Sequence, residues 1–171
     1  SILIIDDEEA NRTLLARRLI RQGYSVLVAA TGEGGLAIAA RESVDVILLD
    51  IWLPGISGYE ILARLKSDEA SREIPVLVIT AVDRPESVAR CLALGADDYL
   101  PKPFDPVVLG VRVRSCLAKK RACDFDLAYL RGVARVTTAA LAVESGSFAA
   151  ESLDEVAQRP DALGNLARLF Q

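Results

Sequence analysis

The segment VILLD, residues 46–50, places four apolar residues directly before a carboxylate. The pattern recurs at the start of the chain, where the apolar residues 2–5 precede Asp6 and Asp7. An uninterrupted apolar run of this length is typical of a strand that is buried on both faces of a parallel sheet. Ligands of such sheets bind just beyond the carboxyl ends of the strands. The sequence therefore predicts that Asp6, Asp7 and Asp50 share one crevice.

Strand and helix patterns alternate through the first two thirds of the chain. Each of five strand patterns is followed by a helical pattern. The strand patterns lie at residues 2–5, 25–29, 44–49, 75–80 and around Tyr99. Strict alternation of this kind predicts an α/β fold, a doubly wound sheet of five parallel strands with helices on both faces. We expect this (βα)5 domain to span residues 1–119, with a helical extension over residues 120–171.

Composition narrows the class of protein. The 171 residues carry a formal net charge of −4, which gives no general attraction for nucleic acid. The three cysteines, Cys91, Cys116 and Cys123, are too few and too scattered for a disulfide framework or a zinc site. No apolar run approaches the ~20 residues of a membrane span and no signal peptide is evident, so we expect a cytoplasmic protein. The chain has no histidine, so any phosphohistidine must belong to another protein.

The residues at the predicted strand ends suit phosphoryl chemistry. A carboxylate such as Asp50 can ligate a metal, act as a base, or attack phosphorus to give an acyl phosphate. Attack on phosphorus requires that charge on the transferring phosphoryl oxygens be neutralised. Asp6 and Asp7 can hold Mg²⁺, which favours one or two carboxylates and keeps several waters. Lys102 offers a compact positive charge to a phosphoryl oxygen, and Thr80 offers a hydroxyl to another.

Together these motifs resemble the receiver domain of two-component response regulators. They occur in the family's order over residues 1–119, as Asp6-Asp7, Asp50, LPGISG at 53–58, Thr80-Ala81, GADDY at 95–99 and KPF at 102–104. The resemblance implies a flavodoxin-like fold and a phosphorylation-dependent switch in a phosphorelay. It also implies that a cognate histidine kinase or phosphotransfer protein supplies the phosphoryl group.

The resemblance assigns a role to each residue of the acidic crevice. Asp50 is the expected phosphoacceptor. Mg²⁺ is expected to be ligated directly by Asp7 and Asp50 and mostly through water by Asp6. The backbone carbonyl of Trp52 completes the ligands that the protein supplies.

A second set of residues is expected to respond to phosphorylation. Lys102, Thr80 and Ala81 bind the phosphoryl group, and the Lys102–Pro103 bond is expected to be cis. Thr80 swings toward the phosphoryl group and Tyr99 turns inward behind it. This coupled movement repacks the face formed by the fourth helix, the fifth strand and the fifth helix.

Three other classes of protein share part of this pattern. A phosphatase of the haloacid dehalogenase type places a second aspartate two residues after its nucleophile, where this chain has Trp52. A flavodoxin-like binder of nucleotide or flavin needs a loop that cradles phosphate, whereas residues 6–9 are all acidic and repel it. A receiver that acts only as a phosphorylation-independent docking module remains an alternative, although no key residue is missing. We expect no enzyme activity beyond the receiver's own phosphorylation and dephosphorylation.

The tail shows helical patterns only. One heptad stripe consists of Tyr129, Val133, Val136, Ala140 and Val143, and a second stripe beside it consists of Leu127, Leu130, Ala134 and Leu141. Gly146 is expected to end this helix. Pro160 is expected to open another helix with Leu163, Leu166 and Phe170 on one side.

Three interpretations of the tail are open. Residues 161–170 resemble the second helix of a HAMP linker, with Phe148 and Leu153 in the connector. A coiled coil or helical hairpin used for dimerisation is the second interpretation, and a tail that packs on its own receiver is the third. The first two imply a parallel homodimer whose helices change register or rotate when the receiver repacks. We expect the natural chain to continue beyond Gln171 into an effector, such as a nucleotide cyclase or a phosphatase.

Overall fold

A computed structural model describes residues 1–81, 84–144 and 153–170, and it divides the chain into two units, Ser1–Arg121 and Ala122–Gln171. The first unit alternates strands and helices. They are β1 Ile2–Ile5, α1 Glu9–Arg21, β2 Val26–Ala29, α2 Gly32–Arg41, β3 Val46–Leu49, α3 Gly58–Ser67, β4 Val76–Thr80, α4 Pro85–Ala93 and β5 Asp98–Pro101. Helix α5, Pro106–Glu144, begins in the first unit and runs into the second.

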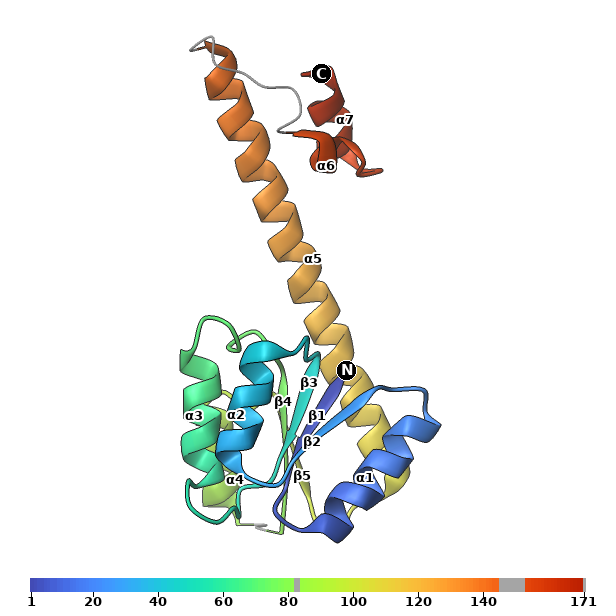
Figure 1. Ribbon diagram of the computed structural model, residues 1–171, viewed down its shortest axis with the longest axis vertical. Helices are drawn as coiled ribbons and strands as arrows, with labels where there is room; N and C mark the ends of the chain where they lie inside the picture. The colour runs from blue at the N-terminus through green and yellow to red at the C-terminus, as the bar shows by residue number, and fades with distance from the viewer. Residues whose placement is uncertain (82–83, 145–152, 171) are drawn as a thin grey trace. The chain divides into compact units, whose positions relative to one another are not determined.

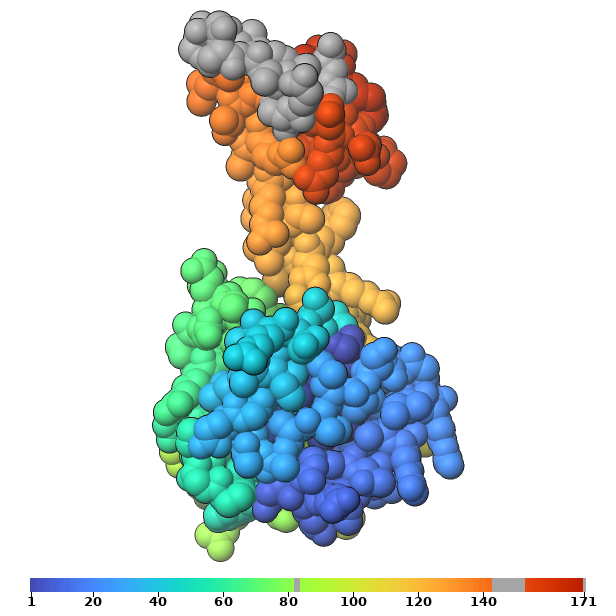
Figure 2. Space-filling model, in the orientation of Figure 1, coloured from blue at the N-terminus to red at the C-terminus, as the bar shows by residue number. Residues whose placement is uncertain are grey.

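The five strands form one parallel sheet in the order β2-β1-β3-β4-β5. Helices α2, α3 and α4 cover one face of the sheet, and α1 and α5 cover the other (Figure 1). The space-filling view in the same orientation shows α1 in blue and α2 in cyan on either side of the edge strand β2 (Figure 2). The predicted doubly wound fold is confirmed.

Alternation of side chains along the buried strands creates two cores. Leu3 and Ile5 of β1 point into the core beneath α2, α3 and α4. Ile2 and Ile4 point into the core beneath α1 and α5. All four residues are at most 1% exposed, because β1 lies inside the sheet and helices cover both of its faces. This explains why the strand reads as a continuous apolar run rather than as an alternating pattern.

Local capping fixes where the helices begin. The Thr31 side chain accepts a hydrogen bond from the backbone of Gly34, and that of Ser57 accepts one from the backbone of Glu60, so both act as N-caps. Pro106 occupies the first position of α5, where its missing N–H would have had no helical partner. These caps place the loops that lead out of the strands at one edge of the sheet.

The second unit contains the distal part of α5 and two short helices, α6 Asp154–Ala157 and α7 Ala162–Leu169. Helix α5 is continuous over 39 residues, so the predicted boundary at residue 119 falls inside a helix and remains a prediction. Helix α7 starts at Ala162 rather than at Pro160. The side chain of Asp161 caps it by accepting a hydrogen bond from the backbone of Gly164 at 3.1 Å. No helix in the described ranges is long and apolar enough to cross a membrane.

The predicted dimer residues of the tail do not share one exposed surface. Val136 and Leu163 are each 6% exposed, and they lie in one small core with Leu153, Val156 and Ala167. Phe170 packs against this core, whereas Leu166 is 43% exposed. Val136 and Leu163 are thus covered within their own chain, and their role in a dimer stays a prediction.

The remaining tail residues that the sequence singled out differ in exposure. Tyr129 and Val133 are 41% and 37% exposed, and Ala140 is half-buried. The side chain of Val143 lies outside the described residues, as do Gly146 and Phe148. The helical hairpin among the three interpretations comes nearest to this packing, and the HAMP-like interpretation stays a prediction.

One buried carboxylate joins three elements of the first unit. Asp97 precedes β5, and its Oδ2 accepts hydrogen bonds from Lys66 Nζ of α3 and from the backbone N–H of Val76 in β4, both at 2.9 Å. Lys119 of α5 forms a further ion pair with Asp97 Oδ1. Burial alone would raise the pKa of Asp97, but the hydrogen bonds from Lys119, Lys66 and Val76 outweigh burial and lower it.

We expect Asp97→Asn to lower the free energy of unfolding at pH 7 by roughly 2 kcal/mol, the scale of a buried charge-assisted hydrogen bond. Because the folded-state pKa of Asp97 is lowered, its stabilisation is present above the unfolded pKa near 3.8 and is lost as the pH falls through the lower folded value. Urea denaturation at a series of pH values measures both effects. The exposed Glu69→Gln is the control. If Asp97→Asn lowered the free energy of unfolding equally at pH 7 and at the acid limit, the stabilising role of the ionised Asp97 carboxylate would be contradicted.

Candidate functional site

Two carboxylates and one ammonium meet at the carboxyl edge of the sheet. Lys102 Nζ donates to Asp6 Oδ2 at 2.7 Å and to Asp50 Oδ2 at 2.6 Å. The side chains of Asp6 and Asp50 are 3% and 9% exposed, and that of Lys102 is 17% exposed. Asp6 directly follows β1 and Asp50 directly follows β3, and these strands are hydrogen-bonded neighbours. The predicted convergence of Asp6, Asp50 and Lys102 is therefore present in the structure.

Backbone groups hold both carboxylates in place. Asp6 Oδ1 accepts a hydrogen bond from the N–H of Glu8 at 2.9 Å, and Asp50 Oδ1 accepts one from the N–H of Trp52 at 3.0 Å. The N–H of Lys102 donates to the carbonyl of Thr80 at 2.8 Å, and the Lys102–Pro103 peptide bond is cis. Each carboxylate thus keeps Oδ2 for the ammonium while its other oxygen is anchored to the main chain.

Gly58 brings α3 close to the loop after β3. A Cβ at this position would lie 2.5 Å from the carbonyl oxygen of Asp50 and 2.5 Å from the Cα of Ile51, both of which are backbone atoms. The N–H of Gly58 donates to the carbonyl of Ile51 at 3.0 Å. Only glycine fits this approach, so Gly58 sets the position of the backbone that carries Asp50.

Two supporting residues were missed by sequence reasoning. Arg12 Nη1 donates to the carbonyls of Asp6 at 2.8 Å and Asp7 at 2.7 Å. Asn11 Nδ2 donates to Glu8 Oε2 at 2.9 Å and lies 3.4 Å from Asp6 Oδ1. A polar residue in the first turns of a helix has no distinctive spacing, so nothing in the sequence separates these two from ordinary surface positions.

Opposing effects act on the charge of Lys102. Burial would lower the pKa of the Lys102 ammonium, but hydrogen bonds to Asp50 and Asp6 outweigh burial, so the pKa is raised. The lysine therefore remains positively charged at neutral pH. Its charge offsets part of the repulsion between two carboxylates that both reach the same atom.

Thr80 ends β4 at the same edge of the sheet. Leu49 pairs with Val78, so Thr80 is level with the residues that follow β3. Thr80 is 1% exposed, and its buried Oγ1 has no hydrogen-bond partner among the described residues. A buried hydroxyl without a partner raises the free energy of the folded state, and a ligand that supplied a partner would relieve that cost. Tyr99 of β5 is 9% exposed and belongs to the core beneath α2, α3 and α4, whereas Ala81 is exposed.

The other predicted metal ligands lie at the surface. Asp7 is exposed, and Trp52 is 67% exposed. Within the described ranges, no three or more carboxylate or thiol side chains gather as a ready metal cluster. The chemistry of the donor set still fits Mg²⁺, because Asp6 and Asp50 converge on one point and Mg²⁺ favours one or two carboxylates with several waters.

A cavity of about 430 Å³ opens beside the lysine. It is lined by Asn11, Leu14, Leu15, Arg18, Lys102, Pro103 and Phe104. Leu14 is 47% exposed there, next to the positive charge of Arg18. The cavity thus joins an apolar surface to the ammonium that holds Asp50.

The family model for the response regulator receiver domain matches residues 2–114. The chain belongs to this family. The match covers the sheet, the acidic site and the first turns of α5, and it assigns no family to the helical tail. Residues 2–114 are thus a two-component receiver domain.

Comparison with individual proteins agrees with this assignment. The response regulator PleD of Caulobacter vibrioides is 44% identical over 123 residues, which are 72% of this chain and 27% of PleD. A CheY-like receiver structure from Methanospirillum hungatei is 30% identical, with a TM-score of 0.67, and the match covers 71% of this chain and 95% of that one. The receiver domain of the sensor histidine kinase PA1611 from Pseudomonas aeruginosa is 31% identical, with a TM-score of 0.64, over 68% and 96% of the two chains.

Two further facts accompany these similarities. The PA1611 receiver structure is described with a magnesium ion coordinated in its active-site cleft. The chain spans between about a quarter and just over half of the length of these curated relatives, for example 27% of PleD and 52% of AfsQ1 from Streptomyces coelicolor. The similarity therefore concerns the receiver domain and does not extend to the other parts of these relatives.

We expect Thr80→Val to raise the free energy of unfolding by about 1 kcal/mol, because valine removes a buried hydroxyl without changing the shape of the side chain. Urea denaturation measures the change. Thr13→Val, on the exposed side of α1, is the matched control and should not stabilise. A destabilised Thr80→Val would show that the hydroxyl already has a partner in the resting protein.

Proposed function

We propose that Asp50 accepts a phosphoryl group from a phosphohistidine of a histidine kinase or phosphotransfer protein, and that the receiver is a phosphorylation-dependent switch. The observation that carries this proposal is the pair of hydrogen bonds from Lys102 to Asp6 and Asp50. They place a nucleophilic carboxylate, a neutralising cation and a second carboxylate at one point. The donor histidine lies outside residues 1–171, because they contain no histidine.

The transfer requires that one oxygen of Asp50 be released, since both are hydrogen-bonded in the structure, one to the N–H of Trp52 and the other to Lys102. A carboxylate oxygen of Asp50 forms a bond to phosphorus as the bond from phosphorus to the imidazole nitrogen of the donor breaks, and the imidazole leaves. Lys102 then neutralises an oxygen of the phosphoryl group while it stays near Asp6. The backbone N–H of Trp52 orients Asp50 throughout. The receiver's chemistry is limited to gaining and losing this group.

Asp7 and Asp50, with Asp6 through water and the carbonyl of Trp52, would hold Mg²⁺. When bound, Mg²⁺ supplies positive charge to the phosphoryl oxygens in addition to that of Lys102. The supporting observation is that Asp6 and Asp50 already point toward a single cation, the Lys102 ammonium. Divalent charge would also offset the repulsion among the three carboxylates.

Thr80 and Tyr99 are the proposed response elements. The buried Thr80 hydroxyl gains a partner when a phosphoryl oxygen lies on Asp50, with Ala81 contributing at the same strand end. Tyr99 of β5 is the register partner of Val78 in β4, and both side chains lie in the core beneath α2, α3 and α4. Thr80 follows Val78 by two residues and faces the same side of the sheet, so movement of Thr80 and repacking of Tyr99 are coupled on that face. The change then reaches the face made by α4, β5 and α5 and passes along α5 to an output domain or partner.

The cavity beside Lys102 is the proposed approach for the donor. Leu14 and Phe104 offer an apolar surface, and Arg18 offers positive charge, within the same lining as Lys102. A donor helix seated there brings its phosphohistidine near the edge of the sheet where Asp50 lies. The contact would give the receiver a way to distinguish one kinase from another.

Saturating Mg²⁺ should raise the melting temperature, because a ligand that binds only the folded state adds about 2.7 kcal/mol at one hundred times its Kd. Differential scanning fluorimetry with Mg²⁺ and with matched ionic strength of NaCl isolates the effect. Asp7→Asn should lose most of the shift, whereas the exposed carboxylate variant Glu86→Gln should keep it. An equal shift in Asp7→Asn would remove Asp7 from the proposed site.

Beryllofluoride, a mimic of the acyl phosphate, should stabilise the wild-type chain further in the presence of Mg²⁺. Asp50→Asn should show no such gain, since the amide offers no carboxylate to beryllium. Thr80→Val should respond less than the wild type, because its side chain cannot donate to the bound group. The same scanning fluorimetry measures all three, and a gain in Asp50→Asn equal to that of the wild type would refute Asp50 as the acceptor.

A further inference from the structure

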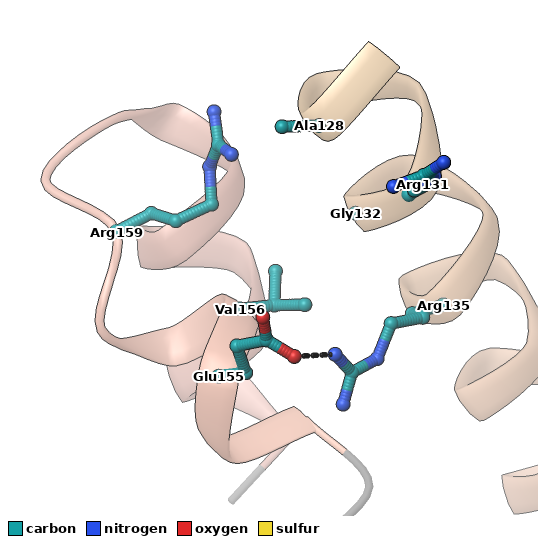
Figure 3. A pocket seen from close by; sticks show the side chains of 7 residues that line it. All are labelled: Ala128, Arg131, Gly132, Arg135, Glu155, Val156 and Arg159. Atoms are coloured by element: carbon teal, nitrogen blue, oxygen red, sulfur yellow. Dashed lines mark hydrogen bonds and ion pairs between the residues drawn. The ribbon is translucent and has the colours of Figure 1, made fainter. Parts of the chain in front are cut away.

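The distal part of α5 is covered on one face by its own chain. Gly132 leaves room for Leu163 of α7, since a Cβ at Gly132 would lie 2.7 Å from a methyl carbon of that leucine. Val136 and Ala139, on the same face, are 6% and 4% exposed. Figure 3 shows Gly132 and Arg135 of α5 facing Val156 and Glu155 of α6, with the ion pair between Arg135 and Glu155 drawn as a dashed line.

A different face of the same helix carries large exposed apolar side chains. Leu130 is 62% exposed and Leu141 is 61% exposed, although both belong to an apolar stripe. The stripe repeats with alternating steps of four and three residues, at Cys123, Leu127, Leu130, Ala134, Thr137 and Leu141. On a helix of 3.6 residues per turn, this stripe is turned well away from Gly132, Val136 and Ala139. We call these six residues the seam.

The seam has the spacing of the a and d positions of a coiled coil. Leu127, Ala134 and Leu141 occupy a positions, and Cys123, Leu130 and Thr137 occupy d positions. The one hydroxyl among them is satisfied locally, because Thr137 Oγ1 donates to the carbonyl of Val133 at 3.0 Å. The methyl group of Thr137 and the small side chain of Ala134 therefore allow another helix to approach closely.

The charges that flank the seam are complementary for one arrangement. In this register Asp126 occupies a g position and Arg131 the following e position. In a parallel, in-register pair of helices, a g residue of one chain faces the next e residue of the other. Asp126 and Arg131 are five residues apart, so they do not face each other within one helix, and neither has an oppositely charged residue three or four positions away.

We propose that the seam binds the seam of a second copy of this chain, and that the two helices form a parallel, in-register coiled coil over residues 123–141. The pairing covers Leu130 and Leu141 and places Asp126 of each copy beside Arg131 of the other. The tail hairpins stay on the outer faces, where Val136 and Leu163 remain packed within each chain. The seam differs from the dimer surface predicted from Tyr129, Val133 and Val136.

The inference does not depend on the phosphoryl chemistry of Asp50. The seam lies on α5, the helix that also packs against the receiver sheet. In the dimer, a rotation of α5 caused by the switch would therefore change its packing against α5 of the second copy. The Asp50→Asn variant should dimerise like the wild type, because the seam does not require a phosphoryl group. A failure of dimerisation therefore leaves the proposed acceptor untouched, and a failure of the acceptor leaves the seam untouched.

Light scattering tests the association directly. We expect the wild-type chain to approach twice its mass of 18.4 kDa as its concentration rises to about 100 μM, since a coil of about three heptads associates only moderately. Leu130→Glu should remain monomeric, because it places two carboxylates in the seam. Leu169→Glu is the matched control, because Leu169 is 83% exposed on α7 and lies outside the seam. A monomeric wild type, or a dimer that survives Leu130→Glu, overturns the proposal.

Cysteine cross-linking tests the direction of the helices. Diamide takes up two electrons and two protons when two thiols join, and Cys123 of the two copies faces itself only in a parallel, in-register pair. We expect a covalent dimer that is lost in Cys123→Ser and kept in the double variant Cys91→Ser, Cys116→Ser. Burial raises the pKa of Cys116 to about 11 and also raises the pKa of Cys91, so these thiols react slowly. A dimer by light scattering that does not cross-link through Cys123 overturns the parallel register.

Charge exchange tests the pairing of individual residues. Arg131→Asp should weaken the dimer roughly tenfold or more, since two attractive pairs become two repulsive ones. The double variant Arg131→Asp, Asp126→Arg should restore most of the affinity. Sedimentation equilibrium measures the dissociation constants. Absence of any restoration in the double variant would contradict the contact between Asp126 and Arg131.

Discussion

The receiver site depends on one ammonium group held between two buried carboxylates. Asp6 and Asp50 would repel each other strongly at this depth if no cation joined them, and Lys102 is that cation. The rest of the first unit brings these three groups to one point. Adjacent strands β1 and β3 carry the two carboxylates, and the segment after β5 carries the lysine. Arg12, Gly58 and the N–H of Trp52 then fix the loops that carry Asp6 and Asp50.

The same arrangement suits the proposed switch. In the proposed transfer, Lys102 moves its contact from Asp50 to a phosphoryl oxygen while it remains near Asp6. Thr80 has a buried hydroxyl for which the resting protein provides no partner among the described residues. Under the proposed function, a phosphoryl group on Asp50 would give this hydroxyl a hydrogen-bond partner.

Strand-end residues were predictable because sequence alone shows where a buried strand stops. The run of residues 46–49 ends at Asp50, and the topology of a parallel sheet then determines which neighbours it meets. Arg12 and Asn11 were not predictable in this way, because they lie only six and five residues after Asp6, and polar residues at such positions early in a helix are common. Asp97 was not predictable for a different reason, since its partners Lys66 and Val76 are 31 and 21 residues away in the sequence.

The tail shows a second limit of pattern reasoning. Two heptad stripes run along the distal part of α5, and spacing alone cannot say which is covered within the chain. Gly132 holds the deciding information, because it makes room for Leu163 and so commits the neighbouring Val136 to the inner core. The stripe through Leu130 and Leu141 is left exposed by that choice. A glycine inside a long helix was thus the signal that distinguishes the two stripes.

Chemical mapping of the phosphorylated residue tests the central claim most directly. The wild-type chain is treated with Mg²⁺ and a phosphodonor, reduced with borohydride so that an acyl phosphate becomes a stable alcohol, and sequenced by tandem mass spectrometry. The account predicts a single modified residue, Asp50, with Asp6 and Asp7 unmodified. Modification of Asp6 or Asp7 in place of Asp50, or the absence of any reducible acyl phosphate, would contradict it.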